Sequence, residues 1–226
     1  MTGLMGRQGL LSEFTWNADG WPEFVNRSPQ APALKDLSRF NIADEFAGNQ
    51  LGLEWQWPLG QLPTMTVRNG QLHLTAEASR LGAVVARRTH AATYKAATTI
   101  DFANLPVDTY AGLAAVGDPY NALALMAGNG QLHVWHLRSG KHQTLAQVFT
   151  ESCDTLSLRL EVWGGQRYRF AYSTDGATWQ PLPTESFSLN GTYLPPWDRG
   201  VRVALVAQGE TGGVATFNNF VVRNQR

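Results

Sequence analysis

The sequence predicts an all-β protein, built as a two-sheet antiparallel β-sandwich of the jelly-roll kind. Beyond Phe40, short runs alternate apolar with polar residues, and turn residues separate one run from the next. Because successive side chains of a strand point to opposite faces, this period of two indicates strands with one buried face. The composition agrees, since 43% of the residues are hydrophobic and only 16% are charged, as in a globular protein with many buried strands.

The strands are best defined where the alternation is longest. The run 155–163 places four aliphatic residues on one face and polar residues on the other. Asn-Gly, Gly-Gly and Asp-Gly pairs lie between several runs, and these residues tolerate the positive φ of tight hairpins. Runs and turns together predict about a dozen strands. The clearest runs are 71–75, 155–163, 167–173, 201–205 and 217–222, and the turns are 69–70, 129–130, 164–165 and 175–176.

The chain divides into two parts with different sequence patterns. Residues 1–39 are irregular and contain, among others, Pro22 and Pro29. Because proline fixes φ and removes a backbone donor, we expect an extended segment or linker here, with one short strand near Leu10–Trp16. Residues 40–226 are expected to form the β-sandwich domain.

Charge and cysteine content argue against several functions. Lys plus Arg equals Asp plus Glu at 18 each, and no basic run is present, so we expect no nucleic-acid partner. No apolar run reaches the roughly 18 residues that span a bilayer, so we expect no membrane partner. Cys153 is the only cysteine, and we expect a structural residue without a disulfide. Met1–Leu11 lack the apolar core of a signal peptide, so we expect a cytoplasmic protein or part of a longer secreted one.

The acidic residues do not form the carboxylate pair that glycoside hydrolysis requires. Asp44 and Glu45 are adjacent, so their side chains point to opposite faces of a strand. Glu161 shares its face with Arg159, and we expect a solvated ion pair there. A Gly-x-Ser-x-Gly motif and a phosphate-binding loop are also absent. The residues therefore give no support for catalysis by this chain alone, and whether it is an enzyme stays open.

A second set of residues suits sugar binding. His133 and Trp135 lie on the outward face of their strand, and Tyr120 lies outward near the start of the preceding one. With Arg159 and Glu161, these side chains would give a groove with an aromatic floor and hydrogen-bonding walls. The alternative is that Trp135 and Tyr120 are buried against the N-terminal segment or against another domain.

Several short motifs follow one another along the chain. They are Asp44-Glu45-Phe46-Ala-Gly48, Leu51-Gly-Leu-Glu-Trp-Gln-Trp57, Arg87-Arg88-Thr89-His90, Thr99-Ile-Asp-Phe102, Tyr110-Ala-Gly-Leu113, the segment Tyr168–Trp179, and Ala215–Phe220. Their order resembles the C-terminal, concanavalin A-like sandwich of family 43 glycoside hydrolases of the β-xylosidase type. Each motif is weak alone, and the specificity of the resemblance comes from the ordered set.

The N-terminal part adds to this resemblance. Gly6–Leu11 and Trp16–Pro22 resemble the closing strand of the family's five-bladed catalytic propeller and the linker beyond it. The resemblance implies that the catalytic Asp and Glu belong to that propeller and lie outside these residues. It also implies a xylan- or arabinan-type oligosaccharide as ligand and a family 43 propeller domain as partner.

The resemblance also implies roles for individual residues. Arg88 and His90 match the family's strand of basic residues and histidine, and they join the expected carbohydrate-binding residues. Asp44 matches the first-strand ligand of a structural calcium that some relatives hold, and no other cofactor is expected. The last-strand carboxylate of that site is replaced by Asn218 or Asn219, which weakens the case for the metal.

Two functions remain open from the sequence. The first is a non-catalytic carbohydrate-binding or ancillary module of a polysaccharide-degrading glycoside hydrolase. The second is a structural interaction domain that packs on a catalytic propeller or self-associates, without sugar affinity of its own. A third, an autonomous hydrolase, requires a carboxylate pair that the sequence does not offer.

Overall fold

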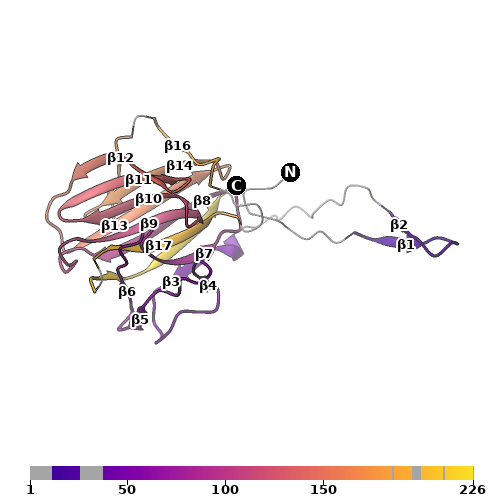
Figure 1. Ribbon diagram of the computed structural model, residues 1–226, viewed down its shortest axis with the longest axis horizontal. Coiled ribbons are helices and arrows are strands. Elements are labelled where there is room, and N and C mark those ends of the chain that lie inside the picture. Colours follow the sequence, from indigo (N-terminus) through magenta and orange to yellow (C-terminus); the bar gives the residue numbers. More distant parts are fainter. Residues whose placement is uncertain (1–11, 26–37, 185, 195–199, 211, 226) are drawn as a thin grey trace.

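The computed structural model describes residues 12–25, 38–184, 186–194, 200–210 and 212–225, and two large antiparallel sheets packed face to face dominate it (Figure 1). Within these residues the only helical element is a single 3-10 turn, η1 (Ser38–Phe40). No helix in the described part of the chain has the length and apolar character to cross a bilayer. The expectation of an all-β sandwich is confirmed.

The first sheet has seven strands, and its central strands come from the middle of the chain. Neighbouring strands are antiparallel throughout. In order across the sheet, they are β12 (Lys141–Phe149), β11 (Gln131–Arg138), β10 (Asn121–Gly128), β9 (Thr109–Asp118), β17 (Arg202–Gly209), β7 (Ala83–Arg88) and β4 (Trp55–Gln56). The edge strand β12 is largely exposed, so this edge of the sheet faces solvent.

The second sheet has ten strands and collects segments from both ends of the sandwich domain. Its main path is β15 (Gln180–Pro181), β14 (Arg167–Ser173), β13 (Thr155–Trp163), β8 (Thr93–Asp101), β18 (Val214–Phe217), β6 (Gln71–Thr75) and β5 (Met65–Arg68). Three further strands are β16 (Leu189–Asn190), paired with β14, β19 (Phe220–Gln225), paired with β8, and β3 (Ile42–Asp44), paired with β19.

The main core lies between the two sheets. The alternation of the sequence selects its members correctly: Leu72 and Leu74 of β6 are fully buried, as are Leu158 and Leu160 of β13. Phe217 of β18 packs among them. Because one face of each strand is removed from water, each such side chain stabilises the fold by about 1.5–3 kcal/mol.

A second apolar cluster covers the outer face of the seven-stranded sheet. Ala114, Ala124 and Ala204 form its floor on three neighbouring strands, and none of them is exposed. Trp135 packs on this floor, together with Leu81 from the connection between β6 and β7. This connection lies against the same sheet, because Gln208 donates hydrogen bonds to the carbonyls of Ser79 and Arg80 in it.

The hairpin turns follow the sequence signals. Asn69 and Gly70 both have positive φ, of 55° and 72°, and so do Asn129 and Gly130, at 52° and 70°. Such angles fit the two-residue turns whose twist matches that of the flanking strands. The pairs therefore set the register of β5 with β6 and of β10 with β11.

The N-terminal part forms a separate two-stranded sheet of β1 (Phe14–Trp16) and β2 (Pro22–Phe24) (Figure 1). The side chain of Asn17 closes its turn by accepting hydrogen bonds from the backbone N–H groups of Asp19 and Trp21. The expected short strand thus has a partner that the sequence did not predict. The segment Gly6–Leu11, with its resemblance to a propeller strand, and Pro29 lie outside the described residues.

Candidate functional site

A pocket opens on the outer face of the seven-stranded sheet, beside the apolar floor. Its volume is about 200 Å³, and strands β9, β10, β11, β12 and β17 supply its walls. The pocket contains two of the residues expected to bind sugar, His133 and Trp135. The lining residues are Tyr110, Met126, His133, Trp135, His142, Thr144 and Gln208.

Two aromatic pairs shape this pocket. The ring of Tyr110 stands edge-on to His133, with 5.7 Å between the ring centroids. The ring of Trp135 lies 4.7 Å from that of His142. Trp135 itself is only 3% exposed, so the expectation of an open stacking floor at this residue is wrong. Its neighbours on the same face include small alanines, on which the indole packs beside the pocket.

The pocket also carries hydrogen-bonding groups that suit hydroxyls. Burial lowers the pKa of His133 and of His142, and His136 lowers the pKa of His142 further, so both rings are neutral at pH 7. The Nε2 atom of His133 is buried and has no hydrogen-bond partner among the described residues. A neutral imidazole offers one donor and one acceptor, and a sugar hydroxyl can both donate and accept.

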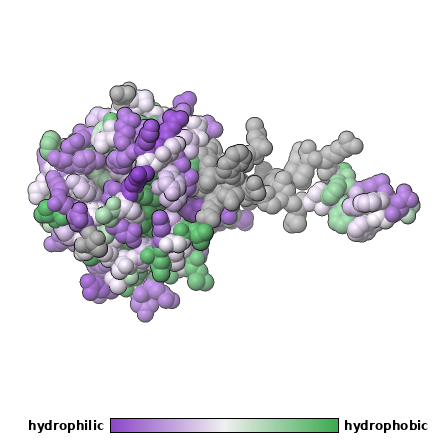
Figure 2. Space-filling model, in the orientation of Figure 1, coloured by the Kyte–Doolittle hydropathy of each residue, from purple (hydrophilic) through white to green (hydrophobic). Residues whose placement is uncertain are grey.

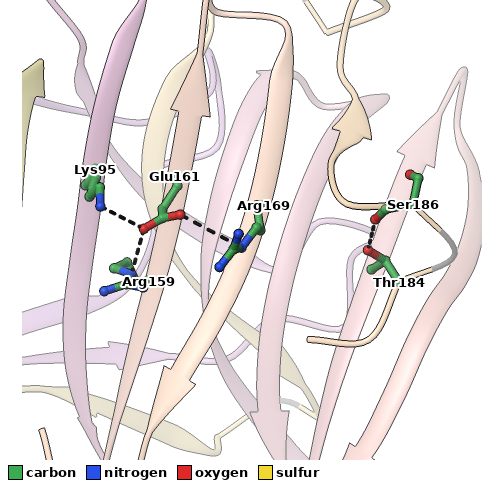
Figure 3. Close-up of polar contacts among 6 residues, drawn as sticks. All are labelled: Lys95, Arg159, Glu161, Arg169, Thr184 and Ser186. Atoms are coloured by element: carbon green, nitrogen blue, oxygen red, sulfur yellow. Dashed lines mark hydrogen bonds and ion pairs between the residues drawn. The ribbon is translucent and has the colours of Figure 1, made fainter. Parts of the chain in front are cut away.

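Arg159 and Glu161 lie on the other sheet, so they cannot share a groove with Trp135. Glu161 of β13 is 5% exposed, and its carboxylate faces Lys95 at 3.1 Å and Arg159 at 3.2 Å (Figure 3). Arg169 of β14 approaches the same carboxylate at 3.9 Å. The pairing of Glu161 with Arg159 is confirmed, but the expectation that it is solvated is wrong.

The remaining expected sugar-binding residues lie elsewhere again. Tyr120 is 61% exposed in the turn between β9 and β10 and does not line the pocket. Arg88 is exposed at the end of β7, and His90 is exposed beyond it, with its ring stacked 5.0 Å from that of Phe40. The structure therefore brings only His133 and Trp135 of the seven expected residues into this pocket, while Arg159 and Glu161 pair with each other on the other sheet. A sugar-binding role for each of the seven stays a prediction.

Asp44 has a structural partner. One of its carboxylate oxygens accepts a hydrogen bond from the indole N–H of Trp55 at 2.8 Å, and the other accepts one from the backbone of Phe46 at 2.9 Å. The side-chain oxygens of Asn218 and Asn219 also accept hydrogen bonds within the fold. Across the described residues, no three His, Cys, Asp or Glu side chains come together as a metal site would need. The side-chain oxygens of Asp44, Asn218 and Asn219 are thus engaged within the fold, and Asp44 as a calcium ligand stays a prediction.

A larger pocket, of about 350 Å³, lies at the end of the sandwich where β8 and β12 end. Its lining includes Phe102, Leu105 and Cys153. Burial, with the nearby carboxylate of Asp154, raises the pKa of the Cys153 thiol, so the thiol is protonated at pH 7. This supports a structural role for Cys153 over a role as a nucleophile.

Five pocket residues were not predicted from the sequence: Tyr110, Met126, His142, Thr144 and Gln208. Their approach to Trp135 depends on the order β12-β11-β10-β9-β17, which places the distant strand β17 beside the consecutive strands β9 to β12. Residue position carries a partial signal for Tyr110, which lies two residues before Gly112 on β9 and is less buried than its neighbours Thr109 and Ala111.

Comparison with known proteins identifies the fold family. The family described as the β-xylosidase C-terminal concanavalin A-like domain matches residues 43–223. The chain belongs to this family. No curated protein sequence matches the chain significantly.

Solved structures agree with this β-xylosidase domain family. The family 43 glycoside hydrolase BlXynB of Bacillus licheniformis is 25% identical, with a TM-score of 0.77 over 98% of this chain and 48% of that one. Xylan β-1,4-xylosidase of Bacillus halodurans is 18% identical, with a TM-score of 0.73 over 94% and 46% of the two chains. The Bacteroides ovatus xyloglucan PUL protein GH43B is 19% identical, with a TM-score of 0.76 over 97% and 48%. The chain thus spans about half the length of these proteins.

Proposed function

We propose that this domain is a non-catalytic ancillary module of a family 43 glycoside hydrolase, and that it binds a xylan- or arabinan-type oligosaccharide in the Tyr110–Trp135 pocket. The observation that carries the proposal is this pocket, which combines aromatic rings with neutral histidines on the outer face of the seven-stranded sheet. The family membership supplies the polysaccharide context.

The dimensions of the pocket favour one sugar ring of a longer chain. Its volume of about 200 Å³ is below the range of pockets that enclose drug-sized ligands. The exposed side chains of His142 and Thr144 on β12 leave it open along the sheet edge, where the rest of an oligosaccharide would extend. Tyr110 offers a ring face or edge to the apolar C–H groups of the sugar, while His133 and Gln208 offer polar atoms.

Replacing Tyr110 with Ala is expected to weaken the binding of neutral xylo- or arabino-oligosaccharides about tenfold, because an aromatic contact contributes about 1–1.5 kcal/mol. Isothermal titration of the purified chain measures this affinity. Thermal unfolding of the variant checks that the sandwich remains folded.

Two further variants sharpen the test. His142→Ala removes an exposed pocket side chain and is also expected to weaken binding. Tyr120→Ala removes an exposed aromatic outside the pocket and is expected to leave the affinity unchanged. An equal loss of affinity in Tyr120→Ala and Tyr110→Ala would reject this pocket as the binding site, and absence of binding by the unmodified chain would reject sugar binding.

A second function, docking on a catalytic domain, is favoured by the N-terminal hairpin. Trp16, Trp21 and Phe24 are 67%, 71% and 59% exposed on it, and Figure 2 shows hydrophobic residues at its surface. An isolated two-stranded hairpin is marginally stable in water, so this one is expected to pack against a partner. The chain spans about half of its relatives, which supports a propeller domain as that partner.

The double variant Trp16→Ser, Trp21→Ser is expected to weaken association with a family 43 propeller domain at least tenfold, since it removes two large apolar side chains from the contact. Sedimentation velocity of the chain mixed with that domain measures the association. Leu53→Ser is the control, because Leu53 is fully exposed on the sandwich. Unchanged association of the double variant would contradict the docking role.

A further inference from the structure

The outer face of the ten-stranded sheet concentrates positive charge. Strand pairing places Arg169, Glu161, Lys95 and Arg223 side by side on β14, β13, β8 and β19. Inward-facing leucines and aromatics alternate with these residues, so all four side chains face outward. With strands about 4.8 Å apart, the row is about 15 Å long.

Two more basic side chains extend this row. Arg167 lies two residues before Arg169 on β14, and Arg159 lies two residues before Glu161 on β13, so both share the outward face. We call the five basic residues the basic face. They are Lys95, Arg159, Arg167, Arg169 and Arg223.

Negative charge on the same face is scarce. Glu161 is the acidic partner in all ion pairs among the described residues, and it contacts Lys95, Arg159 and Arg169. Asp101 of β8 also faces outward, but it lies six residues from Lys95 along the strand, and its carboxylate accepts hydrogen bonds from Asn104. The chain as a whole has a net charge of zero, so this excess of positive charge is local to the basic face.

Aromatic rings hold two of the guanidinium groups in place. Arg159 lies 4.3 Å above the ring of Trp179, and Arg169 lies 4.6 Å above that of Phe187. Trp163 lies beside Phe187, at 6.1 Å between the ring centroids, and Phe187 is 74% exposed. Stacked arginines are pre-organised, so they lose less conformational entropy when they bind a ligand.

The guanidinium groups have hydrogen-bonding capacity to spare. The Nε atoms of Arg159 and Arg169 are buried and face the Glu161 carboxylate, at 3.2 and 3.9 Å, without making a hydrogen bond. The side chains are 19% and 23% exposed, so a ligand would meet the terminal Nη groups, which carry four of the five N–H donors of each guanidinium. Burial lowers the pKa of Arg159, Glu161 raises it and Arg169 lowers it again. An added carboxylate would supply the missing charge and accept from the guanidinium forks.

We propose that the basic face binds the carboxylate groups of an acidic polysaccharide, a xylan chain that carries uronic acid residues. Arginine recognises a planar carboxylate with two parallel hydrogen bonds, and Phe187 and Trp163 beside it offer apolar rings to the sugar. The exposed cations Arg167 and Arg223 at opposite sides of the face would contact successive acidic groups along the chain. This site rests on the proposed carbohydrate-binding function but uses a different sheet from the Tyr110–Trp135 pocket.

The test compares glucuronoxylan with the same polymer after chemical reduction of its carboxyl groups to alcohols. Affinity electrophoresis of the full chain is expected to show retention by the native polymer that falls as salt is added, and at least tenfold weaker retention by the reduced polymer. Arg167→Gln and Arg223→Gln are each expected to weaken retention about threefold, and the double variant about tenfold. Arg68→Gln, an exposed arginine at the far edge of the same sheet, is the control and is expected to change nothing.

Several outcomes would overturn the basic face as a uronate site. Equal retention by native and reduced polymer would do so, as would an unchanged double variant. Equal retention by polyglutamate would show attraction to any polyanion, an acidic protein included, without recognition of a sugar. Titration with neutral xylo-oligosaccharides separates this result from the pocket: the Arg167, Arg223 double variant is expected to bind them normally, and Tyr110→Ala is expected to remain bound to glucuronoxylan.

Discussion

Glu161→Gln is expected to lower the free energy of unfolding by about 3 kcal/mol, because removing one partner of a buried ion pair leaves the others uncompensated. Glu161 is 5% exposed and sits among Lys95, Arg159 and Arg169 within 4 Å. Glutamine has nearly the same shape, so the loss reports the charge rather than a cavity. Urea or thermal unfolding, followed by circular dichroism, measures the change.

Two comparisons test this explanation of the Glu161 effect. Lys95→Met removes a cation whose side chain is 42% exposed, and the expected loss is below about 1 kcal/mol. Glu151→Gln changes an exposed carboxylate outside the cluster and is expected to stay within about 0.5 kcal/mol of the unmodified chain. If Glu161→Gln were as mild as Glu151→Gln, the carboxylate would not be what holds the three cations together.

The burial of Glu161 shows where sequence reasoning stops. Alternation along 155–163 correctly puts Glu161 on the face opposite the leucines, because the period of two is a local property of the strand. Whether that face is open to water depends on what covers it. Trp179 and Phe187 stack on Arg159 and Arg169 from segments that show no alternation, so their position follows only from the tertiary fold.

In the candidate pocket too, local alternation predicts some features and the tertiary fold decides the others. His133 and Trp135 were predictable because they alternate with the buried residues of one strand. The burial of Trp135 was not, because Leu81 and the alanine floor that enclose it belong to four other elements of the chain. The hairpin β1–β2 was missed for a different reason. A local turn at Asn17 forms it, but all residues of its two strands are exposed, so no alternation of apolar and polar residues marks them.

Gly117→Ala is expected to destabilise the domain by about 3 kcal/mol, since an added methyl group in a packed region forces backbone shifts. A Cβ at Gly117 of β9 would overlap the backbone carbonyl oxygen of Leu194. That carbonyl cannot retreat freely, because Tyr193 donates a hydrogen bond to the carbonyl of Ala122 at 3.0 Å and Leu194 is fully buried. Relief of the overlap would therefore draw Leu194 out of the core. Thermal unfolding measures the loss.

Gly48→Ala is the matched control for this substitution. A Cβ at Gly48 would lie 3.6 Å from the nearest backbone oxygen, that of Gln50, which is ordinary van der Waals contact. Its expected effect is within about 0.5 kcal/mol. If Gly117→Ala unfolded at the same temperature as Gly48→Ala, the segment ending at Leu194 would not be packed on β9.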